Sequence, residues 1–482
     1  MSQYRTVHAS RPQGAALTTV LLLASLLVAC PTPPPDGPPE PPTGPVAWQR
    51  GQPELDPGTT LRGMRELRAI VHLHSHWSHD ACDGDPQPGG VPDEDCLTDL
   101  REALCTTRID LAFLSDHPTH ADEAPLQDRL LHRDQDQLVL DSEGRAVGNR
   151  LVCDNGHTSL LLPGVEGDLM PLGITEDLPQ AWNNRTPEAV QELKDSGAVV
   201  WTGHTEVRSL EELAELQADG LELYQLHANL DPDIREDHLG LEPFGYLGEV
   251  APFFFPEPNG IFDPPHPDLA PLGFLELNEP SIVALETLGL TRRLGISGGT
   301  DAHQNVFPTA ASDGERIDSY RRMLRWFNNR LRIEGDLTPE TARAALKAGQ
   351  NHILFEVFGS AVGFDFHAEM GGEIAEMGEE LLLDRGIANL RVELPALDSR
   401  SPQGPSAPVI VGRLYRATDQ GRELLQEWSD GPLDLSVTQA GIYRVEVWIT
   451  PFHLEPYLGE VAADYMGNPI PWIQSNAIFL RE

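Results

Sequence analysis

The chain has 482 residues, of which 75 are acidic and 34 are basic, so its formal net charge at pH 7 is −41. Such a charge repels the phosphate backbone of DNA and RNA, and no basic patch stands out that would bind it. We therefore expect no nucleic-acid polymer as a partner. The length is sufficient for two domains with sizeable hydrophobic cores.

The first 30 residues have the pattern of an export signal. Arg5 and Arg11 precede the apolar residues 15–30, a stretch that is too short and too early for a membrane-spanning helix. Its last four residues, Leu-Val-Ala-Cys, resemble the lipobox of bacterial lipoproteins. This resemblance implies that residues 1–30 are a signal peptide and that lipid on Cys30 anchors an exported protein, facing the periplasm or the cell surface. A signal peptide cut nearby, with Cys30 incidental, is the alternative.

A linker is predicted over residues 31–60. Nine of residues 31–45 are proline, which excludes a helix or a central strand and favours polyproline II. Farther along the chain no segment approaches eighteen consecutive apolar residues, so we expect no transmembrane helix.

Four further cysteines lie close together in the sequence: Cys82, Cys96, Cys105 and Cys153. An even number of cysteines in an exported protein predicts two disulfides, for which three pairings are possible. We favour Cys82 with Cys96 and Cys105 with Cys153. A cysteine zinc site is the less favoured interpretation, because no pair has the two-residue spacing of zinc knuckles.

Short apolar runs alternate with amphipathic helical patterns from residue 61 to residue 360. Six runs have the near-continuous hydrophobicity of buried parallel strands: residues 68–74, 109–115, 159–165, 197–203, 221–226 and 294–299. The alternation predicts an α/β barrel or a doubly wound sheet. Two segments rich in proline, aspartate and glycine, 118–158 and 228–275, interrupt it. We expect them to be long loops that shape a substrate mouth.

The pattern changes after residue 360. Apolar and polar residues alternate between glycine or proline turns, for example in residues 388–395, 409–418 and 441–450. This alternation predicts an antiparallel β-sandwich over residues 361–482. A fold alone assigns it no function.

Ionisable residues stand at the ends of five predicted strands. The first strand ends with His72 and His74, which alternation places on one face. The residues at the other four strand ends are Asp116 with His117, Glu166, His204, and Asp301 with His303. The carboxyl ends of parallel strands meet at one edge, where sites are built, so we expect these side chains to converge.

The order of these motifs, HxH, DH, GxE, GH and DxH, resembles the PHP family, the polymerase and histidinol phosphatase domains. The resemblance covers residues 68–360 and implies a distorted seven-stranded (β/α) barrel that binds two or three divalent metals. It implies one metal held by His72, His74, Glu166 and Asp301. It implies that Glu166 bridges to a second metal held by Asp80, His117 and His303, with His204 at a further position.

Two positions depart from the family pattern or leave a choice. After the first histidine pair, His79 is the alternative to Asp80. After the bridging glutamate many members have a histidine that ligates a third metal, whereas this chain offers Asp168 or nothing. We therefore expect two metal ions rather than three.

The donor atoms point to the same chemistry without the family name. Mixed imidazole and carboxylate ligands suit zinc, manganese or iron(II). Two such ions lower the pKa of a shared water and stabilise in-line displacement at phosphorus. We expect a metal-hydroxide hydrolysis of a small phosphomonoester or phosphodiester. Glu166 would bridge the ions, and His204 or His303 would protonate the leaving oxygen.

Two other functions stay open. Amidohydrolase-type barrels cut amides and esters with similar ligands, but the strand ends here have no lysine that could bridge metals. A non-catalytic binding lipoprotein would show eroded ligand positions. Tyr224 and His227, beyond the fifth strand, are candidates for a substrate contact or a capping role. The nearest candidates for holding a phosphate are Arg145, Arg150, Arg185 and Arg235.

Overall fold

The computed structural model describes residues 47–56, 60–122 and 124–482. The predicted signal peptide with Cys30, and most of the predicted linker, lie outside the described residues. All described residues belong to one compact unit. Among them, no helix combines the length and the apolar character that crossing a bilayer requires.

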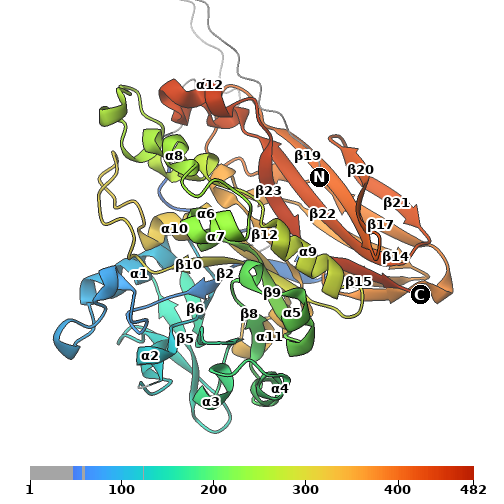
Figure 1. The fold of residues 1–482 in the computed structure, drawn as a ribbon, viewed down its shortest axis with the longest axis horizontal. Helices are drawn as coiled ribbons and strands as arrows, with labels where there is room; N and C mark the ends of the chain where they lie inside the picture. Colours follow the sequence, from blue (N-terminus) through green and yellow to red (C-terminus); the bar gives the residue numbers. More distant parts are fainter. Residues whose placement is uncertain (1–46, 57–59, 123) are drawn as a thin grey trace, which may run out of the picture. The chain divides into compact units, whose positions relative to one another are not determined.

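A parallel sheet forms the centre of the first part of the chain. Its strands in the described residues are, in spatial order, β6 (Thr158–Leu162), β3 (Leu111–Leu114), β2 (Met64–Leu73), β10 (Gly295–Ala302), β9 (Gly220–Gln225) and β8 (Val199–Thr202). They correspond one by one to the six predicted apolar runs, which are thereby confirmed as parallel strands. Figure 1 shows β2 and β10 side by side at the centre.

The strands do not close into a barrel within the part of the chain that the structure describes. β7 (Met170–Leu172) pairs antiparallel with β8, but it meets the chain beyond β6 only at an isolated bridge, Gly164 to Leu172. Pro163 ends the β6 ladder because it has no N–H to donate. A Cβ on Gly164 would lie 2.4 Å from the Leu114 carbonyl oxygen, so this crossing needs glycine. The fold is therefore mixed α/β with large sheets, and the distorted seven-stranded barrel stays a prediction.

Short helices surround these strands. They are α1 (Glu94–Thr106), α2 (Pro118–Ala121), α3 (Pro179–Trp182), α4 (Pro187–Asp195), α5 (Leu210–Leu216), α6 (Leu226–Leu230), α7 (Pro232–Asp237), α8 (Tyr246–Phe254), α9 (Glu279–Leu288), α10 (Tyr320–Trp326), α11 (Pro339–Ala348) and α12 (Ala462–Tyr465). Helix α4 shows why they begin where they do: Pro187 occupies its first turn and the Thr186 hydroxyl accepts a hydrogen bond from the Ala189 N–H. α4 and α11 contact β8 and α9 contacts β9.

The two segments predicted as long loops contain regular structure. In the first, β4 (Gln137–Leu140) and β5 (Ala146–Val152) form a hairpin, and β5 pairs antiparallel with β6. The second contains α6, α7 and α8. Both segments bury part of their apolar side chains, such as Leu151 and Phe253, which outweighs their turn-rich composition.

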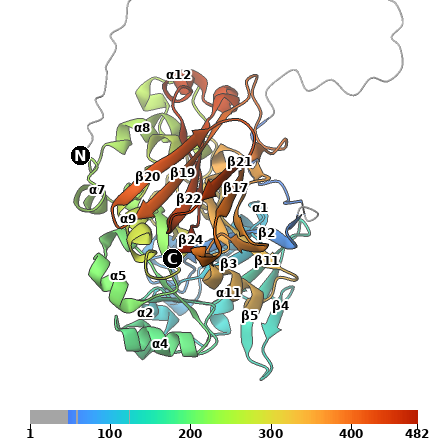
Figure 2. The same ribbon diagram turned by 90° about the vertical axis from the view of Figure 1, so that its right-hand side faces the viewer.

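The C-terminal strands build two antiparallel groups. The first is a sheet in the order β15 (Glu373–Glu376), β14 (Asp365–Met370), β17 (Ala388–Glu393) and β21 (Leu433–Val437). The second contains β20 (Gly421–Trp428), β19 (Val409–Thr418), β22 (Gly441–Thr450), β23 (Ile470–Ser475) and β24 (Ile478–Arg481). Figure 2 shows β20, β19 and β22 side by side. Residues of both groups, Leu390 and Val445 among them, share one hydrophobic core.

The second C-terminal group is continuous with the central sheet. β11 (Asn328–Glu334) pairs with β2 and with β12 (Asn351–Leu354), and β12 pairs with β23. β16 (Glu380–Leu382) pairs with β24 in parallel, which corrects a purely antiparallel arrangement. The short strands β1 (Thr60–Leu61), β13 (Ala361–Val362) and β18 (Ala396–Leu397) complete the described set. The division at residue 360 and the sandwich stay predictions.

Both favoured disulfides are present. Cys82–Cys96 joins the segment after β2 to α1, and Cys105–Cys153 joins the end of α1 to the residue after β5. Their Cα atoms lie 5.8 and 5.6 Å apart. The Cys82 N–H donates to the His303 carbonyl oxygen at 3.0 Å, so the first disulfide braces the segment that bears the predicted site.

Candidate metal centre

Bulges at the ends of β2 and β10 aim the first side chains of the site. The pairing register of β2 with β3 and with β10 shifts between Val71 and Leu73. His72 is therefore an inserted residue that has no paired residue in β3. His72 and Asp301 have positive φ values, 73° and 49°, which are uncommon outside glycine. The Thr300 hydroxyl donates to the His72 carbonyl oxygen at 2.7 Å and holds this conformation. Bulges commonly redirect side chains beside functional sites.

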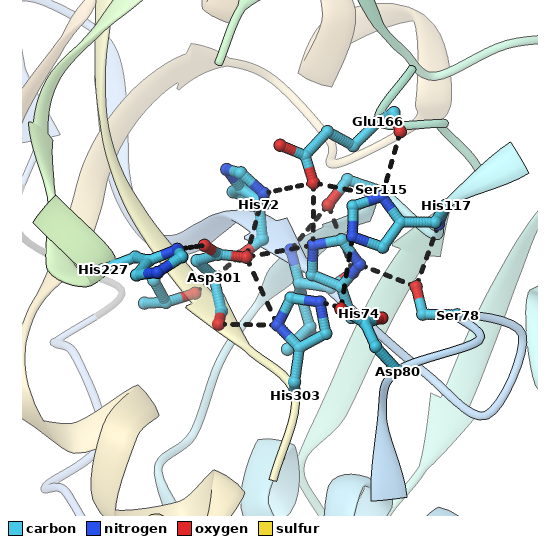
Figure 3. Close-up of polar contacts among 12 residues, drawn as sticks. His72, His74, Ser78, Asp80, Ser115, His117, Glu166, His227, Asp301 and His303 are labelled. Atoms are coloured by element: carbon cyan, nitrogen blue, oxygen red, sulfur yellow. Dashed lines mark hydrogen bonds and ion pairs between the residues drawn. The ribbon is translucent and has the colours of Figure 1, made fainter. Parts of the chain in front are cut away.

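Two imidazoles and two carboxylates meet at one buried point. His72 Nε2 lies 3.0 Å from Glu166 Oε2 and 3.2 Å from Asp301 Oδ1. His74 Nε2 lies 3.3 and 3.2 Å from the same two oxygens. Figure 3 shows the side chains of β2, Glu166 and Asp301 converging in this way. All four residues are buried, and their potential ligand atoms lie within 4.8 Å of one another.

Each imidazole is oriented by a partner on its other nitrogen. His72 Nδ1 lies 2.7 Å from Glu222 Oε1, and His74 Nδ1 lies 2.7 Å from the Ser78 hydroxyl. Such partners fix the ring and direct Nε2 toward a metal. Glu222, which sits inside β9, escaped the sequence interpretation because its strand is buried on every residue and no motif marks it.

Buried polar atoms without hydrogen bonds indicate whether these side chains fit a metal ion. Five buried atoms in the described site make no hydrogen bond although they approach one another: His72 Nε2, His74 Nε2, His303 Nε2, Asp80 Oδ1 and Glu166 Oε2. Buried polar atoms without partners cost free energy, and native proteins rarely retain them without a function. The five atoms are nitrogen and oxygen atoms whose lone pairs can ligate a metal, and they lie around shared points. The five side chains therefore fit bound cations.

A second group lies next to the first. His74, His117 and His303 bring ring nitrogens within 4.8 Å of one another. Asp80 approaches His303 Nε2 at 3.4 Å and His117 Nε2 at 3.6 Å. Glu166 Oε2 lies 3.6 Å from His117 Nδ1, so this carboxylate faces both groups. The structure thus brings together the residues that the family resemblance assigned to a second ion.

A third group contains a residue to which the sequence assigned no metal. His204, His227 and Asp301 can present ligand atoms within 4.8 Å. His204 Nε2 lies 3.1 Å from Glu166 Oε1, and His227 Nδ1 lies 3.2 Å from Asp301 Oδ2, on the side of Asp301 that Figure 3 shows away from His117. The sequence interpretation treated His227 as a substrate contact or a cap. The sequence could have indicated a metal ligand here, because His227 follows β9 closely, as the other site residues follow their strands.

The remaining predicted residues lie around these groups. His79 is half exposed, and its Nδ1 lies 3.9 Å from Asp80 Oδ1. The carboxylate of Asp80 is the one that approaches the imidazoles of the second group. Asp116 accepts hydrogen bonds from the Ser75 N–H and hydroxyl and braces the turn after β2. Asp168 lies 3.0 Å from Arg185 and belongs to none of the three groups found in the described residues.

The electrostatics of the site reflect its carboxylates. Burial lowers the pKa of His72, but the charges of Glu166, Glu222 and Asp301 outweigh it and raise this pKa well above its ordinary value. The pKa of His74 rises to about 9, because the adjacent carboxylates of Asp301 and Glu166 outweigh burial. The pKa values of Glu166 and Asp301 are held well below their usual range, since the neighbouring His72 outweighs the effect of burial. Without a metal, protons on the imidazoles balance these carboxylates.

The two predicted proton donors differ. Burial and the neighbouring His74 lower the pKa of His303 to about 4, so its imidazole is neutral near pH 7. Burial also lowers the pKa of His204, but Glu166 and Glu206 outweigh it and raise this pKa well above the ordinary value. In the metal-free protein His204 is therefore the one of these two imidazoles that carries a proton near pH 7, as a general acid must.

Comparisons with known proteins add little to this geometry. No family model matches the sequence, and no curated protein matches it. A crystal structure of a two-domain protein from Bacteroides vulgatus, which contains a predicted PHP-like metal-dependent phosphoesterase, is 13% identical to this chain. The match covers 88% of this chain and 100% of the other, with a TM-score of 0.34. We base the function on the site itself.

Proposed function

We propose that this chain is a metal-dependent phosphoesterase of the PHP type, which hydrolyses a small phosphomonoester or phosphodiester. One observation carries the proposal: two buried imidazole nitrogens each lie 3.0 to 3.3 Å from the same two carboxylate oxygens, and His72 Nε2, His74 Nε2 and Glu166 Oε2 make no hydrogen bonds. The clusters of His, Asp and Glu fit a metal-dependent hydrolase.

Each group has a distinct part in this proposal. His72, His74, Glu166 and Asp301 would hold the first ion. His117, His303 and Asp80 would hold the second, with Glu166 shared between them. The third group adds a candidate position for a further ion beyond the two predicted. Zinc, manganese or iron(II) bound here would polarise a phosphoryl oxygen and activate water.

The chain's own residues orient the ligands and supply a proton. Glu222 and Ser78 fix the imidazoles of His72 and His74. His204 carries a proton between the carboxylates of Glu166 and Glu206, at 3.1 Å from Glu166 Oε1 and 3.6 Å from Glu206 Oε1. Its side chain is 21% exposed, so it can reach a bound substrate. We assign the protonation of the leaving oxygen to His204 where the third group holds no ion, and to His303 where that ring does not ligate the second ion.

We also propose that the protein works outside the cytoplasm on a small phosphorylated molecule. The two disulfides are the support for an oxidising compartment, because such bonds are rare in reducing cytosol. The lipid on Cys30 and its membrane anchorage belong to the sequence prediction.

The test is hydrolysis by the purified full chain loaded with Mn²⁺ or Zn²⁺. Para-nitrophenyl phosphate and bis(para-nitrophenyl) phosphate report the monoester and diester reactions. Asp301→Ala should lower kcat/KM about 100- to 1,000-fold, the usual loss on removing one central electrostatic group. Asp168→Ala, an acidic residue outside the three groups, serves as the matched control and should keep wild-type turnover. Metal-loaded wild type that hydrolyses neither ester would contradict the proposal.

A further inference from the structure

An apolar cavity of about 470 Å³ opens directly beside the metal groups. Asp80, His227, Asp301 and His303 form one side of its lining, so the cavity and the site share residues. Small-ligand pockets commonly measure about 300–1,000 Å³. The cavity is therefore large enough to hold a substantial part of a molecule whose reacting group lies at the metals.

The rest of the wall is mainly hydrophobic. Its deep part includes Phe274, Met323 and Trp326, each less than 9% exposed. Its rim includes Leu247 and Phe255, which are 46% and 42% exposed. Most of the lining residues come from α6, α8, α10 and the segment after β10, and both α6 and α10 contact β10. An exposed apolar rim around a buried apolar floor is typical of a ligand site rather than of a packing defect.

The polar atoms of the wall are already engaged elsewhere. The Tyr246 hydroxyl donates to the Leu230 carbonyl oxygen at 2.9 Å, and the Trp326 indole N–H donates to the Asp268 carbonyl oxygen at 3.0 Å. The carboxylate of Asp318 accepts hydrogen bonds from the N–H groups of Val306 and Phe307. The wall therefore offers few free polar atoms to a ligand.

No lysine or arginine lines this cavity, all of whose lining residues are described. The four arginines considered as phosphate clamps contact other groups: Arg145 pairs with Asp141, Arg150 with the Leu337 carbonyl, Arg185 with Asp168 and Arg235 with the Asn229 carbonyl. A second phosphate or a carboxylate would meet the carboxylate of Asp231 in the wall, with no lysine or arginine among the lining residues to balance it. The cavity selects against an anionic group and favours an uncharged one.

We propose that the alcohol part of the substrate is a large, uncharged, apolar group, alkyl or aryl, which occupies this cavity while the phosphoryl group lies at the metals. The inference rests on the proposed phosphoesterase function and names its substrate class. Burial of apolar surface in the cavity then contributes to kcat/KM.

A series of phosphate monoesters tests the inference. The purified full chain, loaded with Mn²⁺, is assayed with ethyl, butyl, hexyl and octyl phosphate and with 1-naphthyl phosphate. We expect kcat/KM to rise about three- to fourfold for each added methylene. Comparison of octyl with naphthyl phosphate distinguishes an alkyl from an aryl occupant. Equal kcat/KM for ethyl, octyl and naphthyl phosphate would overturn the inference while leaving the phosphoesterase function intact, whereas no turnover of any ester would overturn both.

A matched pair of phenylalanine variants locates the effect. Phe255→Ser removes an aromatic ring from the rim, while Phe262→Ser removes one that is 93% exposed and does not line the cavity. We expect the ratio of kcat/KM for octyl over ethyl phosphate to fall at least fivefold in Phe255→Ser and to stay at the wild-type value in Phe262→Ser. The same ratio in both variants would overturn the assignment.

A binding measurement reports on the cavity without catalysis. The fluorescent probe N-phenyl-1-naphthylamine brightens in apolar surroundings, and we expect it to bind wild type and Phe262→Ser at least fivefold more tightly than Phe255→Ser. Octyl phosphate should displace the probe at concentrations where ethyl phosphate does not. Probe binding that is insensitive to Phe255→Ser and to octyl phosphate would overturn the inference.

Discussion

His227 is the residue whose role changes most between sequence and structure. Its Nδ1 lies 3.2 Å from Asp301 Oδ2, and with His204 it completes the third group. His227→Ala removes one of the two imidazoles there, so, where wild type holds an ion at this third position, we expect the metal content to fall by about one ion per chain. Mass spectrometry of metal content in dialysed protein measures this. His238→Ala, an exposed histidine outside the groups, is the control, and equal metal content in both variants would contradict the third position.

The raised pKa of His74 predicts how metal binding depends on pH. In the metal-free protein a folded pKa of about 9, above the ordinary value of 6.5, contributes stability that is fully present below about pH 6.5 and is lost as the pH rises through about 9. A metal needs the neutral imidazole and must displace this proton. Thermal unfolding should therefore show a larger increase in Tm on adding Mn²⁺ at pH 8 than at pH 6. An equal or smaller increase at pH 8 would show that the imidazoles do not bind the metal.

At the scale of elements, the two disulfides have different neighbours. Cys82–Cys96 braces the segment that bears Asp80 and contacts the His303 backbone, whereas Cys105–Cys153 lies at the far end of α1. Replacing either pair by alanine should cost about 2–4 kcal/mol of unfolding free energy in urea. Only loss of Cys82–Cys96 should also weaken metal binding at the second group, about tenfold by isothermal titration calorimetry. Equal metal affinity in the two double variants would show that Cys82–Cys96 does not support metal binding at the second group.

The sequence predicts elements well where the pattern is local. The six parallel strands follow from continuous apolar runs, and the site histidines and acids follow from their positions at strand ends. The β4–β5 hairpin was missed because residues 118–158 are rich in turn formers, and only pairing with β6 makes the hairpin a part of the sheet. The open junction between β6 and β7 depends on Pro163 and on the close approach at Gly164, which no periodicity reveals.

At the scale of the whole molecule, the features that the sequence could not predict are long-range. Pairing of β12 with β23 joins residues more than a hundred positions apart and makes the C-terminal strands continuous with the central sheet. The apolar cavity likewise combines side chains from Leu226 to Trp326, and no single stretch shows that they share one space. Orientation of His72 by Glu222 across 150 positions is of the same kind.

A buried ion cluster contributes to the stability of the whole unit. Asp268 has no exposed surface and accepts hydrogen bonds from Arg321, at 2.7 Å, and from Arg322. These arginines outweigh burial and hold the pKa of Asp268 well below its usual range, so this stability is present above the unfolded pKa near 3.8 and is lost as the pH falls. Asp268→Asn leaves buried arginines uncompensated and should cost about 3–5 kcal/mol in urea unfolding at pH 7. A loss no greater than that of the exposed control Asp134→Asn would contradict the role of the cluster.

The most direct test of the account is anomalous X-ray diffraction from crystals of the full chain equilibrated with Zn²⁺. The account predicts an anomalous peak between His72 Nε2, His74 Nε2, Glu166 Oε2 and Asp301 Oδ1, and a second beside His117 and His303. Crystals in which zinc lies elsewhere, with those four side chains contacting only one another, would contradict the metal centre and the function derived from it.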